Sequence, residues 1–475
     1  MRLNKIENII FVCFLLFILN DAFGKFYRYP ISEQLGLSIN FLKYGYFFPD
    51  FNGKDFYPVS PYFPGLAFLI YLLRFVIPDY LLFEFLTILG ILSIFFFFFI
   101  SIKISKKIYK KIPEYNICWL IIILLCLWPC RFWLYYAITF KTDTLSFGLI
   151  FFAIYILEIN RKNYRINFLQ VLISFILILY SISLKQQAIF VVFALGLFSL
   201  LNKDYFLRIF SFIMILSIGL FYFLMFEDKN LWFFNILRFS GNSFYTLKAI
   251  VRDNYEDITK IIFLILFLTV CNLEKLGFNN LQEKIKKTFF GFKKNIWLYI
   301  FFFLSITGIP GFLKYGGNFG NIGMSIIVLT PIIIYFLGDL KKNILTFTVM
   351  ALLVLEFPTV RGSFNNYIES KKMQNKVLQL VKGEDLKILT DTESLFSSFL
   401  ISDNNLLHSV DTMMILDRFV DKNQEKDFKL KTKDLEMYDF LIISNRNSSL
   451  IEVESFKLIH KSKLSRIYNK KKDES

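Results

Sequence analysis

Three carboxylates lie apart from one another in residues 23–61, a polar stretch that follows the first apolar segment. They are Glu33, Asp50 and Asp55. A carboxylate can take a proton from an attacking hydroxyl, and nearby prolines stiffen this part of the chain. We therefore consider all three as candidate general bases, with Glu33 first. The Tyr and Phe residues of the same stretch are typical of an interfacial aromatic belt and need no role in chemistry.

Cationic residues lie beside breaks between the later apolar segments: Arg131, Lys141, Lys185 and Lys314. A charge at the centre of a membrane helix costs about 2.5 to 3.5 kcal/mol, so several cations near one membrane face indicate a use for them. Arginine suits two-point contact with phosphate. Each cation taken alone also fits a side chain that extends to lipid headgroups. Asp143 is either a functional acid or a structural partner of Lys141 or Arg131.

Only two histidines occur in the chain, His408 and His460, and both lie in the charged C-terminal region. A histidine-based metal site in the apolar part is therefore excluded. The sequence has no zinc-ligand spacing, P-loop or G-x-G-x-x-G motif, and surface positions without a role are the usual explanation for two such isolated histidines.

The elements that must position these residues are membrane helices. Hydrophobic residues make up 55% of the chain and charged residues 19%, against about a quarter charged in soluble domains. Residues 81–102 form an unbroken apolar block of the length that crosses a bilayer, and in lipid such a block must be helical. We predict spans near residues 6–22, 62–77, 81–102, 117–137, 144–158, 168–184, 188–201, 209–226, 258–273, 297–309, 322–338 and 343–357.

The basic residues predict the orientation of these spans. Lysines and arginines gather in residues 103–111, 161–165, 203–208, 284–294 and 341–342, which we place in the cytoplasm together with the N-terminus. The net charge of +16 thus follows the membrane pattern and does not indicate nucleic acid. Twelve crossings conflict with a C-terminus on the outer side. Either residues 62–77 are re-entrant or surface-lying, or another crossing exists, which gives about 11 to 13 spans.

The composition changes after residue 358. Residues 359–475 are charged and contain short strand-like runs, LKILT at 386–390 and DFLIIS at 439–444. We predict a membrane domain of residues 1–358 and a small α/β domain of residues 359–475 in the periplasm or outside the cell.

Four fragments in order resemble the GT-C superfamily of polyprenyl-phosphate-sugar glycosyltransferases, which includes protein O-mannosyltransferases and lipid A aminoarabinose transferases. The first is Glu33 after the first span, followed by Gly45 and by Tyr62-Phe63-Pro64-Gly65 at the start of an apolar segment. The second is Arg131 with Lys141-Thr142-Asp143. The third is Leu184-Lys185-Gln186-Gln187-Ala188, and the fourth is the Gly-rich turn from Lys314 to Asn321. Many members carry an Asp-Glu pair where this chain has Ser32-Glu33.

The resemblance implies an α-helical polytopic membrane enzyme of the inner or plasma membrane. Its substrates would be a polyprenyl-phosphate-linked sugar and a lipid, glycan or protein acceptor at the outer face. Transfer needs a base for the acceptor hydroxyl and cations for the phosphate. Some relatives engage a divalent metal through acidic residues; no other cofactor is implied. The implied substrate- and phosphate-binding residues are Tyr62, Arg131, Lys141, Asp143, Lys185, Gln186, Lys314 and Asn321.

The sequence is also compatible with two other classes of membrane protein. A lipid-linked oligosaccharide flippase or other transporter would place charges along a permeation path, whereas here they concentrate near one face and no internal repeat is visible. An O-antigen ligase or polymerase also lacks nucleotide motifs, but it relies on a large late external loop, while the acid-bearing loop here is early.

Overall fold

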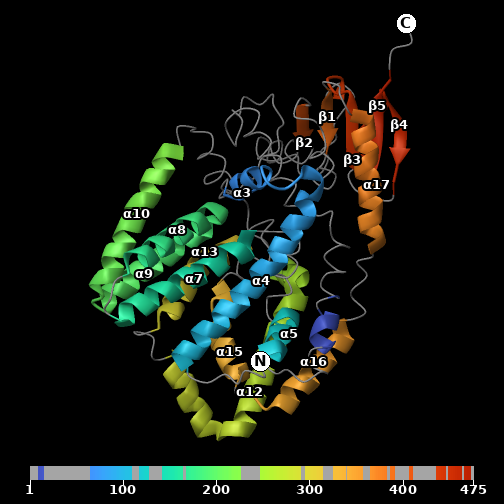
Figure 1. Ribbon diagram of the computed structural model, residues 1–475. Coiled ribbons are helices and arrows are strands. Elements are labelled where there is room, and N and C mark those ends of the chain that lie inside the picture. Colours follow the sequence, from blue (N-terminus) through green and yellow to red (C-terminus); the bar gives the residue numbers. More distant parts are fainter. Residues whose placement is uncertain are drawn as a thin grey trace.

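The computed structural model is mostly helical and ends in a small β-sheet (Figure 1). It describes residues 9–14, 16, 65–109, 117–127, 142–163, 167–225, 247–289, 295–313, 325–338, 340–356, 364–381, 386–390, 406–409, 435–445, 448–462 and 465–471. The combination of apolar helices with a C-terminal mixed sheet confirms the predicted fold class. The division at residue 358 stays a prediction.

The helices follow the apolar blocks of the sequence. Their bounds are α3 Gly65–Leu73, α4 Asp79–Tyr109, α5 Ile117–Leu127, α7 Thr142–Asn163, α8 Phe168–Leu184, the 3₁₀ turn η2 Gln186–Ala188, α9 Ile189–Leu201, α10 Tyr205–Met225, α12 Leu247–Phe289, α13 Ile296–Leu313, α15 Thr330–Gly338, α16 Lys342–Glu356 and α17 Phe364–Val381.

The helix α3 is too short to cross a bilayer. Its nine residues rise about 14 Å, against a hydrocarbon thickness of about 30 Å. A turn from Arg74 then leads to Pro78, and α4 begins at Asp79 with 31 residues. In Figure 1, α3 lies crosswise beside the upper end of α4. Within residues 62–77 the described part thus fits the re-entrant or surface-lying alternative.

Several helices expose apolar faces that a soluble protein would bury. Along α10 the exposed side chains recur on one face, as Ile209, Phe212, Leu216 and Leu220. In the described part of the chain, two helical stretches are long and apolar enough to span a membrane by themselves, Glu84–Lys107 and Ile258–Lys286, and shorter apolar helices accompany them. The exposed faces therefore suit a lipid environment.

The interior between the helices is packed by aromatic residues. Phe151 of α7 contacts Phe97 of α4 and Trp297 of α13, with ring centroids 4.8 and 4.7 Å apart. Phe198 of α9 meets Tyr299 of α13 edge to face at 5.4 Å. Such contacts add roughly 0.5 to 1.5 kcal/mol each beyond burial, and they fix α4, α7, α9 and α13 as one unit.

The helix α12 bends at Gly277. The backbone there has φ 68° and ψ 166°, a conformation that essentially only glycine adopts. Beyond the bend, the Lys284 ammonium donates to the Asn272 side-chain oxygen at 3.1 Å and lies 4.4 Å from the ring centroid of Tyr335 in α15. Lys284, which the sequence analysis assigned to a basic loop, is thus a buried residue within a helix. Its aliphatic stem and the neighbouring ring make this burial tolerable.

The C-terminal sheet has five strands in the order β2-β1-β3-β5-β4. The strands are β1 Lys387–Thr390, β2 Leu406–Ser409, β3 Phe440–Ser444, β4 Phe456–Lys461 and β5 Ser465–Lys470, with the 3₁₀ turn η8 Ser448–Leu450 between β3 and β4. The strands β1, β2 and β3 pair in parallel, whereas β5 pairs antiparallel with β3 and β4. The predicted runs at 386–390 and 439–444 became β1 and β3, whose buried apolar residues made them recognisable.

Candidate functional site

A buried ion pair joins Asp143 and Lys185. The Lys185 Nζ lies 3.0 Å from the Asp143 Oδ1, and the two side chains are 9% and 2% exposed. Asp143 occupies the first turn of α7, and Lys185 follows the last residue of α8. The carboxylate thus lies at the positive end of one helix dipole and the ammonium at the negative end of another, which favours both charges.

Hydroxyl groups hold α7 and α8 together below this pair. The Ser146 hydroxyl donates to the Ser181 carbonyl at 3.0 Å, and the Ser174 hydroxyl donates to the Ala153 carbonyl at 3.3 Å. Early residues of α7 therefore meet late residues of α8, as in an antiparallel hairpin. Small polar residues allow close helix approach in membranes, and this register brings Asp143 to Lys185.

The end of α8 gives Lys185 an unusual backbone. Lys185 is extended, with φ −146° and ψ 111°, and its N–H still donates to the Ser181 carbonyl. The turn η2 follows, and α9 continues from Ile189. Because of this break between two apolar helices, the Lys185 side chain leaves the backbone in a different direction from the one it would take in a continuous helix. Such breaks within membrane helices commonly form ligand sites.

The helix α3 packs against the same end of α8. The Tyr180 hydroxyl donates to the Gly65 carbonyl at 3.4 Å. A Cβ on Gly65 would lie 2.6 Å from the carbonyl carbon and from the carbonyl oxygen of Ser183. Only glycine permits this contact, and Ser183 precedes Lys185 by two residues. The glycine of the Tyr62-Phe63-Pro64-Gly65 motif therefore sets how closely α3 approaches the lysine.

Gln187 of η2, which was not among the predicted site residues, has an unusual side chain. Its side-chain oxygen is buried, and it accepts no hydrogen bond from the residues that the structure describes. Leaving such an oxygen unsatisfied costs about 1 to 3 kcal/mol, so a buried group of this kind calls for an explanation. In the sequence, only its proximity to Lys185 marks Gln187. Gln186 is also a glutamine close to Lys185, so the sequence does not distinguish the two.

The predicted site residues divide into two groups. Asp143, Lys185 and Gln186 are described, and the structure brings Asp143 and Lys185 into contact; Gln186 is half-buried in η2. The others lie outside the described residues, namely Glu33, Asp50, Asp55, Tyr62, Arg131, Lys141, Lys314 and Asn321. Asp143 thus contacts a lysine 42 positions later. Arg131 and Lys141, the two partners considered for it from the sequence, lie outside the described residues.

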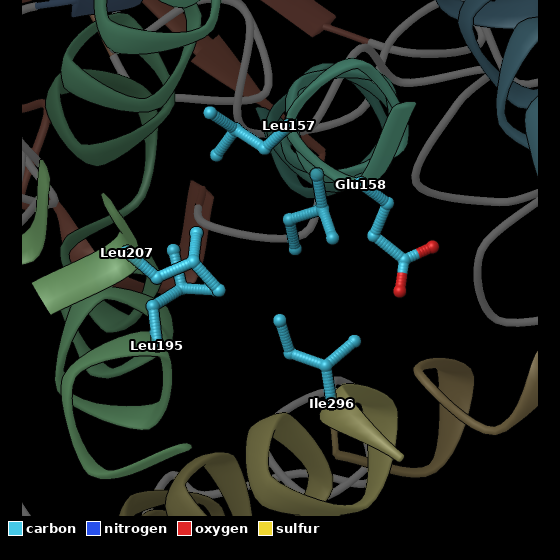
Figure 2. Close-up of a pocket in the computed structure, with 6 residues that line it drawn as sticks. Leu157, Glu158, Leu195, Leu207 and Ile296 are labelled. Carbon is cyan, nitrogen blue, oxygen red and sulfur yellow. The ribbon is translucent and has the colours of Figure 1, made fainter. Parts of the chain in front are cut away.

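Two further features bear on the position of the site. Among the described residues, no three His, Cys, Asp or Glu side chains gather as a metal site. A narrow hollow lies between α7, α9, α10 and α13, lined by Leu157, Leu195, Leu207 and Ile296 with the Glu158 carboxylate at its edge (Figure 2). It is too narrow to hold a water molecule, and Glu158 is about 22 Å along α7 from Asp143. The hollow is a packing gap and not a substrate cavity.

Comparison with known proteins identifies the fold. No family model matches the chain, and no curated protein matches it by sequence. Among solved structures, the chain is similar to the crystal structure of ArnT from Cupriavidus metallidurans bound to undecaprenyl phosphate. The TM-score is 0.53 at 9% sequence identity, and the match covers 97% of each chain.

The match confirms the expected resemblance at the level of the fold. Because it covers almost the whole of both chains, it includes the C-terminal sheet as well as the helices. Together with the exposed apolar residues of the helices, it indicates a membrane protein with an ArnT-like fold.

Proposed function

We propose that this chain is a membrane glycosyltransferase that moves a sugar from a polyprenyl-phosphate donor to a lipid, glycan or protein acceptor at the outer face of the membrane. The observation that carries the proposal is the buried Asp143/Lys185 pair at a helix break within an ArnT-like fold. The ligand of ArnT, undecaprenyl phosphate, is a lipid phosphate. Such a ligand needs a cation at the level where its phosphate meets the protein.

Lys185 is the cation we assign to the donor phosphate. A lysine ammonium has three N–H donors, which suits it to contact a carboxylate and a phosphate oxygen together. When the sugar departs, negative charge grows on the phosphate. A cation already held in a water-poor site stabilises that charge without reorganising during the reaction. Burial of Lys185 makes this stabilisation larger than a solvated lysine would give.

Asp143 acts on Lys185 in this proposal. Its carboxylate fixes the position of the ammonium and compensates the cost of burying it. This makes Asp143 a positioning residue. The base that takes the acceptor proton is a different carboxylate, and we assign it to Glu33, with Asp50 and Asp55 as the alternatives. No step depends on a metal ion, although acidic residues of the first loop could hold one.

We expect the purified protein to transfer a sugar from a lipid-linked donor to an acceptor. Purified protein in detergent or liposomes is incubated with radiolabelled undecaprenyl-phosphate sugars and a membrane extract as acceptor. Wild type is expected to form labelled glycoside, and Glu33→Gln is expected to lower the rate about 100-fold or more, as the loss of a general base does. Movement of the lipid-linked sugar across the bilayer without any glycoside would contradict the proposal and favour a transporter.

Gln187 gives a prediction in which stability and binding change in opposite directions. Its buried oxygen has no donor among the described residues, so Gln187→Leu is expected to raise the melting temperature of the ligand-free protein. If a donor hydroxyl of the bound substrate satisfies this oxygen, the same variant binds the lipid-linked sugar about 10-fold more weakly. Thermal unfolding and equilibrium binding measure the two effects. A variant with weaker binding and a lower melting temperature would instead indicate a packing role.

A further inference from the structure

The C-terminal region is joined to the membrane helices by a second ion pair. The Lys371 Nζ of α17 lies 2.5 Å from the Glu84 Oε1 of α4, and the side chains are 26% and 14% exposed. The neighbouring pair of Lys372 and Glu369 on the same helix is much more exposed, at 68% and 34%. Partial burial distinguishes the Glu84/Lys371 pair from an ordinary surface contact, whose contribution is small.

The helix α17 also contacts the β-sheet. Its buried residues Met373 and Val377 pack against Ile388 of β1 and Ile442 of β3. In Figure 1, α17 runs alongside the sheet, next to the upper end of α4. The helix α17 thus contacts the sheet through apolar residues and α4 through Lys371.

The same helix α4 also contacts α7, next to the Asp143/Lys185 pair. The hydroxyls of Ser93 in α4 and Thr144 in α7 are hydrogen-bonded at 2.9 Å, and Thr144 is adjacent to Asp143. Gly148 of α7 lies against Phe96 of α4, so closely that a Cβ on Gly148 would come within 3.2 Å of the ring. Glu84 and Ser93 are nine residues apart, about 14 Å along one continuous helix.

We propose that α4 couples the C-terminal sheet to the Asp143/Lys185 site, through the Glu84/Lys371 ion pair at one contact and the Ser93/Thr144 hydrogen bond at the other. Glu84 and Ser93 are positioning residues in this scheme. The chain of contacts consists of packed helices and two polar links, which can carry a displacement between distant positions. The inference rests on the proposed function only for the role of the Asp143/Lys185 pair. Its test does not require activity.

Hydrogen exchange on the full-length protein tests the coupling. Lys371→Met is expected to raise amide exchange about fivefold in α17 and also in the first two turns of α7, residues 142–149. Lys372→Met, which removes the exposed neighbouring lysine, is expected to leave α7 unchanged. Lys371→Arg and the charge exchange Glu84→Lys with Lys371→Glu are expected to restore slow exchange at both places.

Ser93→Ala separates coupling from a simple tether. In that background, Lys371→Met is still expected to loosen α17, but its effect on residues 142–149 should disappear, as a double-mutant cycle would reveal. If Lys371→Met loosens α17 alone in the otherwise unchanged protein, the ion pair is only an anchor and the coupling is refuted. If neither segment changes, the ion pair does not hold the sheet at all. A protein without transferase activity can still give the expected exchange pattern, so the two proposals fail separately.

Discussion

Replacing Lys185 with methionine is expected to abolish sugar transfer and to destabilise the protein by about 3 to 5 kcal/mol, because the Asp143 carboxylate would remain buried without its partner. The loss of transfer follows from the loss of the only cation that the structure places beside Asp143 among the described residues. Thermal unfolding in detergent measures the first effect, and the transfer assay with labelled undecaprenyl-phosphate sugar measures the second. Lys372→Met is the matched control, since its exposed pair contributes no more than about 1 kcal/mol.

The double variant Asp143→Asn with Lys185→Met separates stability from catalysis. It removes both charges, so no uncompensated charge stays buried and much of the lost stability should return. Transfer should nevertheless stay at least about 100-fold below wild type, because no ammonium faces the donor phosphate. A double variant that regains both stability and transfer would reduce the pair to a structural contact and would contradict the role assigned to Lys185.

The membrane helices could be predicted from the sequence because lipid leaves the backbone no alternative. An apolar block of about 20 residues must be helical there, and the blocks at 81–102 and 168–184 correspond to α4 and α8. The segment 62–77 was ambiguous for a physical reason. Its hydropathy matches a span, but Arg74 and the turn before Pro78 end the helix after nine residues. A hydropathy average does not register such an interruption, whereas the length of the folded helix does.

The site was predictable in its residue types and only partly in its contacts. Lys185 was selected because a cation beside an apolar segment is costly, and Asp143 because its fragment resembles one of the GT-C superfamily. The predicted orientation placed both near one face. Their direct contact depends on the register of α7 against α8, which the hydrogen bonds of Ser146 and Ser174 set. Serines in apolar helices are common enough that no sequence pattern identifies these as the ones that pair.

The strands of the C-terminal sheet illustrate the same limit. The runs that became β1 and β3 are buried, apolar and β-branched, and they were recognised. The strand β4 is half-exposed, and in β5 only Ile467 and Tyr468 lie between the polar residues Arg466 and Asn469. Their pairing depends on the antiparallel contact with β3, a tertiary interaction that local composition does not encode.

Gly65→Ala is expected to lower both stability and transfer although it changes no charge. The added Cβ would lie 2.6 Å from the backbone carbonyl of Ser183, so α3 must move away from α8. Overpacking of this kind costs about 1 to 3 kcal/mol. Because Ser183 is two residues from Lys185, the movement also displaces the ammonium, and a misplacement of about 1 Å can lower a rate by about 100-fold. The melting temperature and the transfer rate measure the two effects.

Two further variants make this prediction specific. Gly219→Ala in α10 adds the same methyl group where no atom lies within 4 Å, so it is expected to change stability by less than about 1 kcal/mol, in the stabilising direction. Ser183→Gly combined with Gly65→Ala removes the hydroxyl but keeps the backbone carbonyl, and should therefore not restore transfer. Full restoration by that pair would mean that α3 approaches α8 only through the serine side chain. The position of Lys185 would then not depend on the backbone contact at Gly65.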